Sequence, residues 1–245
     1  MSVPLNFPDA LASPREFISR NTRVQATPLL PEIELFLAHE MLPLWQLTES
    51  ELERSGLPPP YWAFAWAGGQ ALARFILDNP QMVAGKHVLD LACGSGIVAI
   101  AAAQAGARSV LAADLDALAC AACKMNAEHN NAQIQVLQTD LITSKAPPKI
   151  HRQTNDDYCA AATLSSIEVI VSGDVFYEQP MAEKFEAWLR AMAGAERLVL
   201  VGDPHRTYFP QHGVELLQRY QVITTRELED SDLRNTAVWR IEAPS

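Results

Sequence analysis

The residues best suited to chemistry in this chain stand in a short glycine-rich turn. Gly94, Ser95 and Gly96 lie in the stretch HVLDLACGSGIVAIAAAQAG, directly after a short apolar run. Glycines permit a tight turn whose backbone N–H groups face a ligand, and the N-terminus of a following helix adds partial positive charge. Asp114 ends the next apolar run, where a carboxylate accepts hydrogen bonds from ribose hydroxyls. The pattern predicts a nucleotide cofactor, and NAD fits it so far.

Asp90 distinguishes between two cofactors. It stands near the end of the apolar run VLDL, shortly before the first glycine of the turn. A carboxylate at this place repels the pyrophosphate of NAD, whereas it attracts the ammonium and sulfonium groups of S-adenosylmethionine. The sequence therefore favours S-adenosylmethionine as the cofactor.

Asp140 ends a third apolar run, in the stretch VLQTDL. Its place at the carboxyl end of a predicted strand suits an interaction with the edge or the amino group of an adenine. A helix cap or a turn residue explains the same position equally well. We assign Asp140 and the adjacent Leu141 to the adenine end of the cofactor site.

A second motif, SGDVFYE, follows the fourth predicted strand and places Asp174 and Tyr177 at D-x-x-Y spacing. Ligands of doubly wound sheets bind at this edge. Nucleic-acid amino methyltransferases commonly hold a planar base amine with two prolines between such residues, but here Val175 and Phe176 occupy those places. If the cofactor donates a methyl group, the motif therefore favours a lysine amine as the methyl acceptor.

Other candidate residues receive no chemical role. Asp203, His205 and Arg206 lie in GDPHRTYF after the fifth predicted strand and are expected at the rim of the same crevice. Cys120 and Cys123 have C-x-x-C spacing, but no further pair of zinc ligands follows at suitable spacing. On a helix among alanines they are expected to be small buried thiols, and no metal is predicted.

The composition excludes several classes of protein. The chain has 245 residues, of which 49% are hydrophobic, so it can bury the core of a large α/β domain. Its 29 acidic and 19 basic residues give a net charge of −10, which disfavours nucleic acid as a partner. No uninterrupted apolar stretch approaches the roughly eighteen residues of a membrane span, and the N-terminus lacks a signal pattern. A soluble cytoplasmic protein is expected, of unknown oligomeric state.

The elements that must position these residues form an alternating pattern, which predicts a mostly parallel sheet of Rossmann-like α/β type with helices on both faces. Seven strands are predicted, at 87–91, 109–114, 134–137, 167–172, 197–201, 222–226 and 236–241. Helices are predicted at 69–79, 97–105, 115–129, 179–193 and 211–220. The short link between the last two strands indicates an antiparallel hairpin at one edge. Residues 144–165 show neither period and are predicted to form a loop.

The chain before the sheet is predicted to be a helical extension over residues 1–57, followed by the main domain over 58–245. The best helical signal there is PEIELFLAHEMLPLW, which begins at Pro31. Trp62, Phe64 and Trp66 alternate in YWAFAW, so an extended segment would place them on one face. Trp62 and Phe64 are expected in the core, and Trp66 is expected over the cofactor, where an aromatic face suits adenine or a cation.

Several of these motifs together resemble the class I, seven-stranded S-adenosylmethionine methyltransferases. Within that superfamily NTRVQATPLLPEIELFL, PPYWAFAWAGGQALARFILDNP and VGDPHRTYF resemble the lysine methyltransferases that modify the β subunit of electron transfer flavoprotein. The likeness runs from about Phe17 to Trp239 and departs in the longer segment 144–165. It implies a protein-lysine methyltransferase acting on that β subunit, with a ribosomal protein as a further possible substrate. It also implies that Asp174 faces the acceptor amine and that Trp66 contacts the cofactor.

The chemistry of methyl transfer limits what Asp174 does. The acceptor lysine must be neutral, which costs roughly 4 to 5 kcal/mol at pH 7 for an unperturbed pKa near 10.4. A carboxylate is too weak a base to remove that proton, so Asp174 is predicted to orient the amine. Burial and the charge of the cofactor favour the neutral amine. Tyr177 either hydrogen-bonds in the site or walls it as a half-buried aromatic.

Two other functions compete with lysine methylation. An NAD-dependent oxidoreductase would use the same glycine turn, but Asp90 opposes it and no residue suited to hydride transfer is evident. A non-catalytic binding module on a methyltransferase fold is the second alternative, and the intact D-x-x-Y acid disfavours it.

Overall fold

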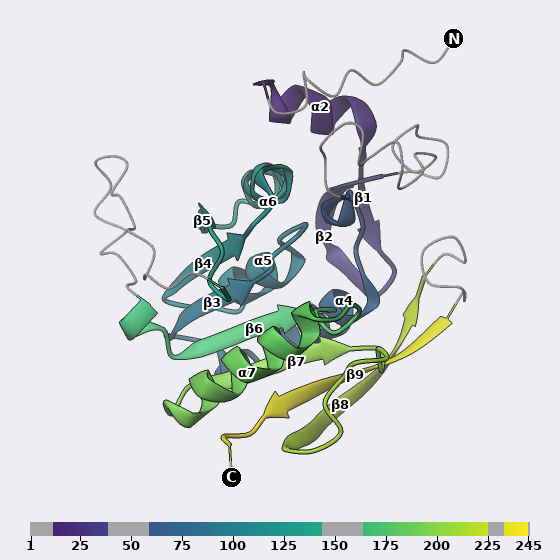
Figure 1. Ribbon diagram of the computed structural model, residues 1–245. Helices are drawn as coiled ribbons and strands as arrows, with labels where there is room; N and C mark the ends of the chain where they lie inside the picture. Colours follow the sequence, from purple (N-terminus) through teal and green to yellow (C-terminus); the bar gives the residue numbers. More distant parts are fainter. Residues whose placement is uncertain (1–11, 39–58, 144–163, 225–232, 245) are drawn as a thin grey trace.

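The computed structural model describes residues 12–38, 59–143, 164–224 and 233–244. Its centre is a seven-stranded sheet in the order β5-β4-β3-β6-β7-β9-β8. The first five strands of that order run parallel, and β9 pairs antiparallel with both β7 and β8 (Figure 1). The bounds are β3 His87–Leu91, β4 Ser109–Asp114, β5 Gln135–Gln138, β6 Val169–Gly173, β7 Leu198–Asp203, β8 Val214–Ile223 and β9 Leu233–Ile241. The predicted fold class is confirmed, including the antiparallel hairpin at one edge.

Helices cover both faces of this sheet, which explains why the central strands are continuously apolar. One face carries α4 Ala67–Asp78, α5 Ile97–Gln104 and α6 Ala117–His129, while α7 Met181–Gly194 lies on the other (Figure 1). Successive residues of β3 serve the two sides: Val88 packs with α4 and α5, and Leu89 packs with α7. The four helices confirm four of the five helices predicted in this part of the chain, with shifts of one or two residues at most ends.

The N-terminal part differs from the prediction. Helix α2 Pro14–Asn21 is followed by a hairpin of β1 Arg23–Thr27 and β2 Leu30–Leu37. The helix predicted from Pro31 is therefore wrong over the residues that the structure describes. Burial in β2 alternates, with Ile33, Leu35 and Leu37 inside, and this period of two is what a strand needs to cover a core.

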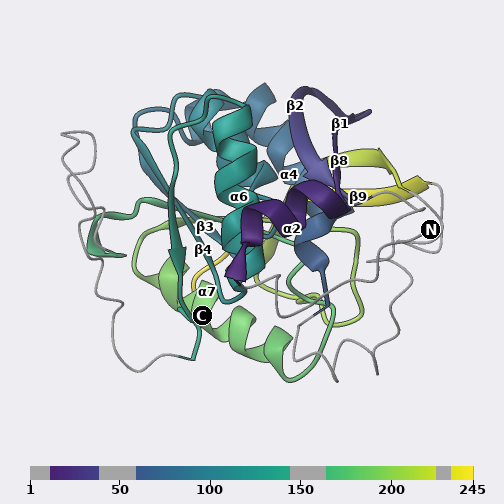
Figure 2. The same cartoon turned by 90° about the horizontal axis from the view of Figure 1, so that it is seen from above.

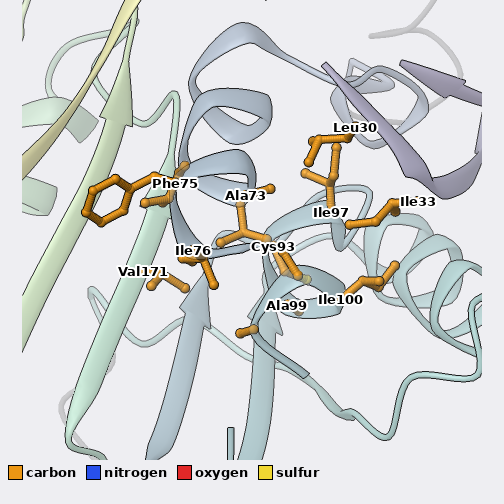
Figure 3. Packing of buried hydrophobic residues seen from close by; sticks show 14 of the residues in the cluster. Leu30, Ile33, Ala73, Phe75, Ile76, Cys93, Ile97, Ala99, Ile100 and Val171 are labelled. Atoms are coloured by element: carbon orange, nitrogen blue, oxygen red, sulfur yellow. The ribbon is translucent and has the colours of Figure 1, made fainter. Parts of the chain in front are cut away.

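The hairpin packs onto the main domain. Leu30 and Ile33 lie against Ile97 and Ile100 of α5 in the same hydrophobic cluster (Figure 3). Helix α2 lies across α6 (Figure 2), where Arg15 forms an ion pair with Glu128. The N-terminal segment thus belongs to the same core as the sheet.

Two further local predictions are wrong. Residues predicted as a helix at 211–220 belong mostly to β8, an edge strand of ten residues that pairs with β9 across an irregularity between Leu216 and Gln218. The backbone hydrogen bonds that β9 offers outweigh local helix propensity there. Tyr61–Ala63 form a short 3₁₀ turn, η2, so the YWAFAW segment is not extended throughout. The predicted loop at 144–165 lies outside the described residues, except for the 3₁₀ turn η4 Leu164–Ser166.

Candidate functional site

A cavity of about 420 Å³ opens at the carboxyl ends of β3, β4 and β6 and is bounded by the segment before α4. Seven of the residues predicted for the site line it: Trp66, Asp90, Gly94, Ser95, Asp114, Asp174 and Tyr177. They meet because parallel strands all end at one edge of the sheet. Cys93, Tyr61 and Arg206 also line the cavity.

Three predicted residues do not line the cavity. Gly96 has φ +80° at the start of α5, and a Cβ there would lie 2.6 Å from the Sγ of Cys123, so its role is close packing on α6. The carboxylate of Asp140 accepts hydrogen bonds from the backbone N–H groups of Ile142 and Thr143. This is the turn geometry that explained Asp140 equally well, and Leu141 is buried in the core beneath α7.

Carboxylates from two strands hold the glycine turn and the first turn of α5. Asp114 Oδ2 accepts a hydrogen bond of 2.9 Å from the backbone N–H of Gly94, and Asp90 Oδ2 accepts one of 2.9 Å from that of Ala99. Asn126, buried on α6, donates to the carbonyl of Ser95 at 2.7 Å. Sequence reasoning missed Asn126, because only the packing of α6 against the turn reveals its contact.

The cavity floor carries two buried carboxyl groups, Asp90 and Asp114. Burial raises the pKa of Asp90 to about 8, since only the N–H of Ala99 and no positive charge compensates it, and the nearby Asp114 raises it further. Burial likewise raises the pKa of Asp114 above its usual range. Two buried acids without a cation among the described residues suit a ligand that is itself positively charged, as predicted for the sulfonium and ammonium of S-adenosylmethionine.

Asp114→Ala is expected to weaken cofactor binding, because it removes both the acceptor for the Gly94 N–H and the predicted acceptor for the ribose. Thermal unfolding provides the measurement. At a hundredfold excess over its dissociation constant, S-adenosylhomocysteine should stabilise the wild-type protein by about 2.7 kcal/mol, while NAD should not. The variant should lose most of this shift. A stabilisation by NAD alone would overturn the cofactor assignment, and an unchanged shift in Asp114→Ala would place the ribose elsewhere.

The opposite wall of the cavity is built around Asp174, directly after β6. Its φ of +58° turns the side chain back over the N-terminus of α4, where Oδ2 accepts a hydrogen bond of 3.0 Å from the Gly69 N–H. The close approach of α4 to β7 requires glycine: a Cβ on Gly202 would lie 2.0 Å from the carbonyl oxygen of Gly68. These contacts fix the position of the Asp174 carboxylate relative to the sheet.

Arg206 contacts the same carboxylate. Its Nη2 and Nε lie 2.7 and 3.2 Å from Asp174 Oδ1, and its guanidinium carbon lies 5.6 Å from the centre of the Trp66 ring. The sequence placed Arg206 at the rim but assigned it no role. The signal was its position just after β7, the strand beside the one that ends at Asp174.

Aromatic rings complete the opening of the cavity. Tyr61 lies edge-on to both Tyr177 and Trp66, with ring centres 5.4 and 5.9 Å apart, and Trp66 donates its indole N–H to the Tyr61 carbonyl. Tyr177 is 47% exposed, and partial burial raises the pKa of its hydroxyl to about 12, so it stays protonated. Trp62 and Phe64 are buried as predicted, although both also border the cavity. The three rings of Tyr61, Trp66 and Tyr177 and the buried carboxylate of Asp174 suit a long apolar side chain with a terminal amine.

The described part of the chain contains no group of side chains placed to bind a metal ion. Cys93, Cys120 and Cys123 are buried free thiols, in agreement with the structural role predicted for the C-x-x-C pair. Within the same residues, none of the helices has the length and apolar character needed to span a bilayer.

Comparisons with known proteins find related methyltransferases. The chain is 38% identical over 234 residues to the electron transfer flavoprotein beta subunit lysine methyltransferase of Xenopus laevis, covering 94% of this chain and 87% of that protein. It is 34% identical to the human protein of the same name, covering 92% of this chain and 80% of the relative. The family of ribosomal protein L11 methyltransferases (PrmA) matches residues 71–165.

Among solved structures, the chain is similar to the magnesium protoporphyrin IX methyltransferase of Synechocystis PCC 6803 with bound S-adenosylmethionine. The TM-score is 0.48 at 12% identity, with 99% of this chain and all of that chain covered.

Proposed function

The chain belongs to the family of electron transfer flavoprotein beta subunit lysine methyltransferases, and we propose that its own substrate is a lysine of that β subunit. As a member of this family it is an S-adenosylmethionine-dependent protein-lysine methyltransferase. The observation that supports the proposed substrate most directly is the likeness over more than nine-tenths of the chain, which includes the wall around Asp174 as well as the glycine turn.

The residues of the cavity form a cofactor end and an acceptor end. When bound, S-adenosylmethionine would supply an electrophilic methyl carbon on its sulfonium sulfur, and S-adenosylhomocysteine would be the leaving group when a neutral amine attacks that carbon in line. Asp114 holds the glycine turn and Asp90 holds the first turn of α5, and both carboxyl groups face a positively charged cofactor, which favours their ionised form. At the other end, Asp174 accepts a hydrogen bond from the acceptor amine and directs its lone pair along the line of attack, while Tyr61 and Tyr177 enclose the side chain that carries the amine. Positioning is most of the catalysis, because no acid or base need act on the cofactor.

Ribosomal protein L11 is a second candidate substrate, because the PrmA family matches the part of the chain from α4 through β5 and beyond. That segment contains the glycine turn and Asp114 but not Asp174 or Tyr177. The match therefore concerns the cofactor end of the site, which methyltransferases with different substrates share. The likeness to the flavoprotein-subunit methyltransferases covers the acceptor end as well.

Incubation of the purified protein with S-adenosylmethionine and the flavoprotein β subunit of the same organism should add methyl groups to one or a few lysines of that subunit. Intact-mass and peptide mass spectrometry measure the product, and ribosomal protein L11 in a parallel reaction serves as the competing acceptor. Modification of L11 with no change in the β subunit would contradict the proposed substrate. Modification of neither by a protein that binds S-adenosylhomocysteine would contradict both.

A further inference from the structure

The carboxylate of Asp174 does not stand alone in the cavity. Oδ1 is held by Nη2 of Arg206 at 2.7 Å and by Nε at 3.2 Å, and the two side chains are only 8% and 19% exposed. Charge-assisted contacts of this length are strong when they are shielded from water. Asp174 and Arg206 therefore form a nearly neutral pair at the acceptor end of the site.

A lone carboxylate would oppose the reaction at this position. An opposite charge within about 4 to 6 Å stabilises the charged form of a titrating group, so an unpaired aspartate would raise the pKa of a neighbouring lysine. The ammonium form has no lone pair and cannot accept a methyl group. The same carboxylate that orients the amine would thus keep it in the unreactive state.

We propose that Arg206 is a positioning residue, which cancels the charge of Asp174 so that the carboxylate orients the acceptor amine without holding its proton. This inference rests on the proposed function, because it concerns the lysine that enters the cavity. On this view the neutral form of the amine is favoured by the charge of Arg206 as well as by the charge of the cofactor.

The surroundings of Arg206 fit this task. Its backbone N–H donates to Oδ1 of Asp203 at 2.7 Å, and its guanidinium lies over the Trp66 ring, so the loop after β7 and the segment before α4 both hold it in place. The His205 ring is directed away, toward Phe209 and Trp239.

Other charged and titratable groups also act on this pair. Asp203 is fully buried, and its pKa rises to about 7 through burial and the repulsion of Asp174. Tyr61 and Tyr177 border the pair, and Asp114 and Glu178 add negative charge nearby. Most of these groups are acidic or neutral, so the positive charge of Arg206 is what offsets the negative charge of Asp174. A substitution of Arg206 therefore removes that compensation.

The first test is the pH dependence of kcat on the flavoprotein β subunit. The value of kcat should rise with pH as the bound amine loses its proton. Arg206→Gln should shift this rise to higher pH by about one unit, because loss of a nearby positive charge raises the pKa of the bound amine. Arg206→Lys keeps the charge and should keep the wild-type profile. Arg74→Gln is the matched control: Arg74 is 20% exposed and ion-paired with Glu32 and Asp78, but it does not line the cavity.

The second test needs no protein substrate. S-adenosylmethionine and S-adenosylhomocysteine differ by the sulfonium charge, so the ratio of their dissociation constants, measured by calorimetry, reports the charge of the site. Arg206→Gln should increase the preference for S-adenosylmethionine by about three- to tenfold, and Asp174→Asn should change it in the opposite direction. The double variant should return to the wild-type ratio, and Arg74→Gln should not move it.

The outcomes separate this inference from the proposed function. If the wild-type protein methylates the β subunit but Arg206→Gln shows an unshifted pH profile, the inference is wrong and the function stands. If the wild-type protein leaves that subunit unmodified, the proposed substrate is wrong. The role of Arg206 is then tested only by the ratio of the dissociation constants of S-adenosylmethionine and S-adenosylhomocysteine. An unchanged ratio in both Arg206→Gln and Asp174→Asn then overturns the inference. If Arg206→Gln does not fold, the ratio of the two dissociation constants in Asp174→Asn decides: a lower preference for S-adenosylmethionine supports the inference, and an unchanged ratio overturns it.

Discussion

Asp174→Ala is expected to lower the rate of lysine methylation by about ten- to a few hundredfold, while S-adenosylhomocysteine binds with nearly unchanged affinity. The reason is that a charge-assisted hydrogen bond to the amine contributes roughly 1.5 to 3 kcal/mol to the orientation of the nucleophile. Asp114 holds the glycine turn and Asp90 holds the start of α5, and Asp174 contacts neither in this way, so the cofactor end should remain intact. The defect should therefore appear in turnover.

Part of this loss comes from the wall itself. Alanine leaves the Gly69 N–H at the start of α4 without its acceptor and leaves Arg206 without the Asp174 carboxylate. Asp174→Asn keeps the shape and an acceptor for Gly69 but not the charge, and it should recover little activity. Urea unfolding of both variants shows whether the wall is intact. Full methylation by either variant, measured by mass spectrometry, would remove Asp174 from the catalytic residues and direct attention to Glu178 or Asp203.

The affinity for S-adenosylmethionine is expected to rise with pH between about 6 and about 8, by up to about tenfold per pH unit from Asp90 alone. The pKa of Asp90 in the free protein is about 8, so the buried carboxyl is mostly protonated at neutral pH. A positively charged ligand favours the carboxylate and lowers that pKa, so binding releases a proton. Above about pH 8 the carboxyl is already ionised and its contribution levels off.

Asp90→Asn is the control for this linkage. The amide oxygen can still accept the hydrogen bond from the Ala99 N–H, but the side chain no longer titrates. The cofactor amino group, whose pKa is near that of an α-amino group at about 7.7 to 8.0, titrates in both proteins and cancels in the comparison. Calorimetry in buffers of different ionisation enthalpy counts the protons. Identical pH dependence in the two proteins would remove Asp90 from the linkage.

The stability of the free protein should change with pH in a related way. The folded pKa of Asp90 lies above its ordinary value of 3.8, so the folded state binds more protons than the unfolded state between these two values. The stabilisation of the folded state that this proton provides is fully present below about pH 4 and is lost as the pH rises toward about 8. Asp90→Asn should flatten this part of the stability profile.

Much of the site follows from the sequence because of one geometric rule. Asp90, Asp114 and Asp174 each stand at or just after the end of an apolar run, and the runs are parallel strands that end at one edge. Residues at corresponding strand ends must therefore meet, whatever the details of side-chain packing. The same rule would have placed Arg206 beside Asp174, since β7 neighbours β6.

Local patterns were weaker guides where pairing with another segment decided the structure. The stretch at β2 contains apolar residues at both helical and strand spacing, and its antiparallel partner β1 and the surface of α5 select the strand. In β8 the partner β9 does the same. Asp140 shows a related limit, because a strand-end aspartate binds a ligand or caps a turn according to where its oxygens point, and here they face Ile142 and Thr143.

The sequence by itself determined the alternation of helices and strands from α4 to β7, the glycine turn, its acids and the D-x-x-Y motif, because these depend on residues near one another in the chain. Only the tertiary structure decided the charge state of the site. The burial that raises the pKa of Asp90 requires the whole cavity, and the pairing of Asp174 with Arg206 joins two loops separated by α7 and β7. Burial and charge pairing act through space, so they exist only after distant segments have come together.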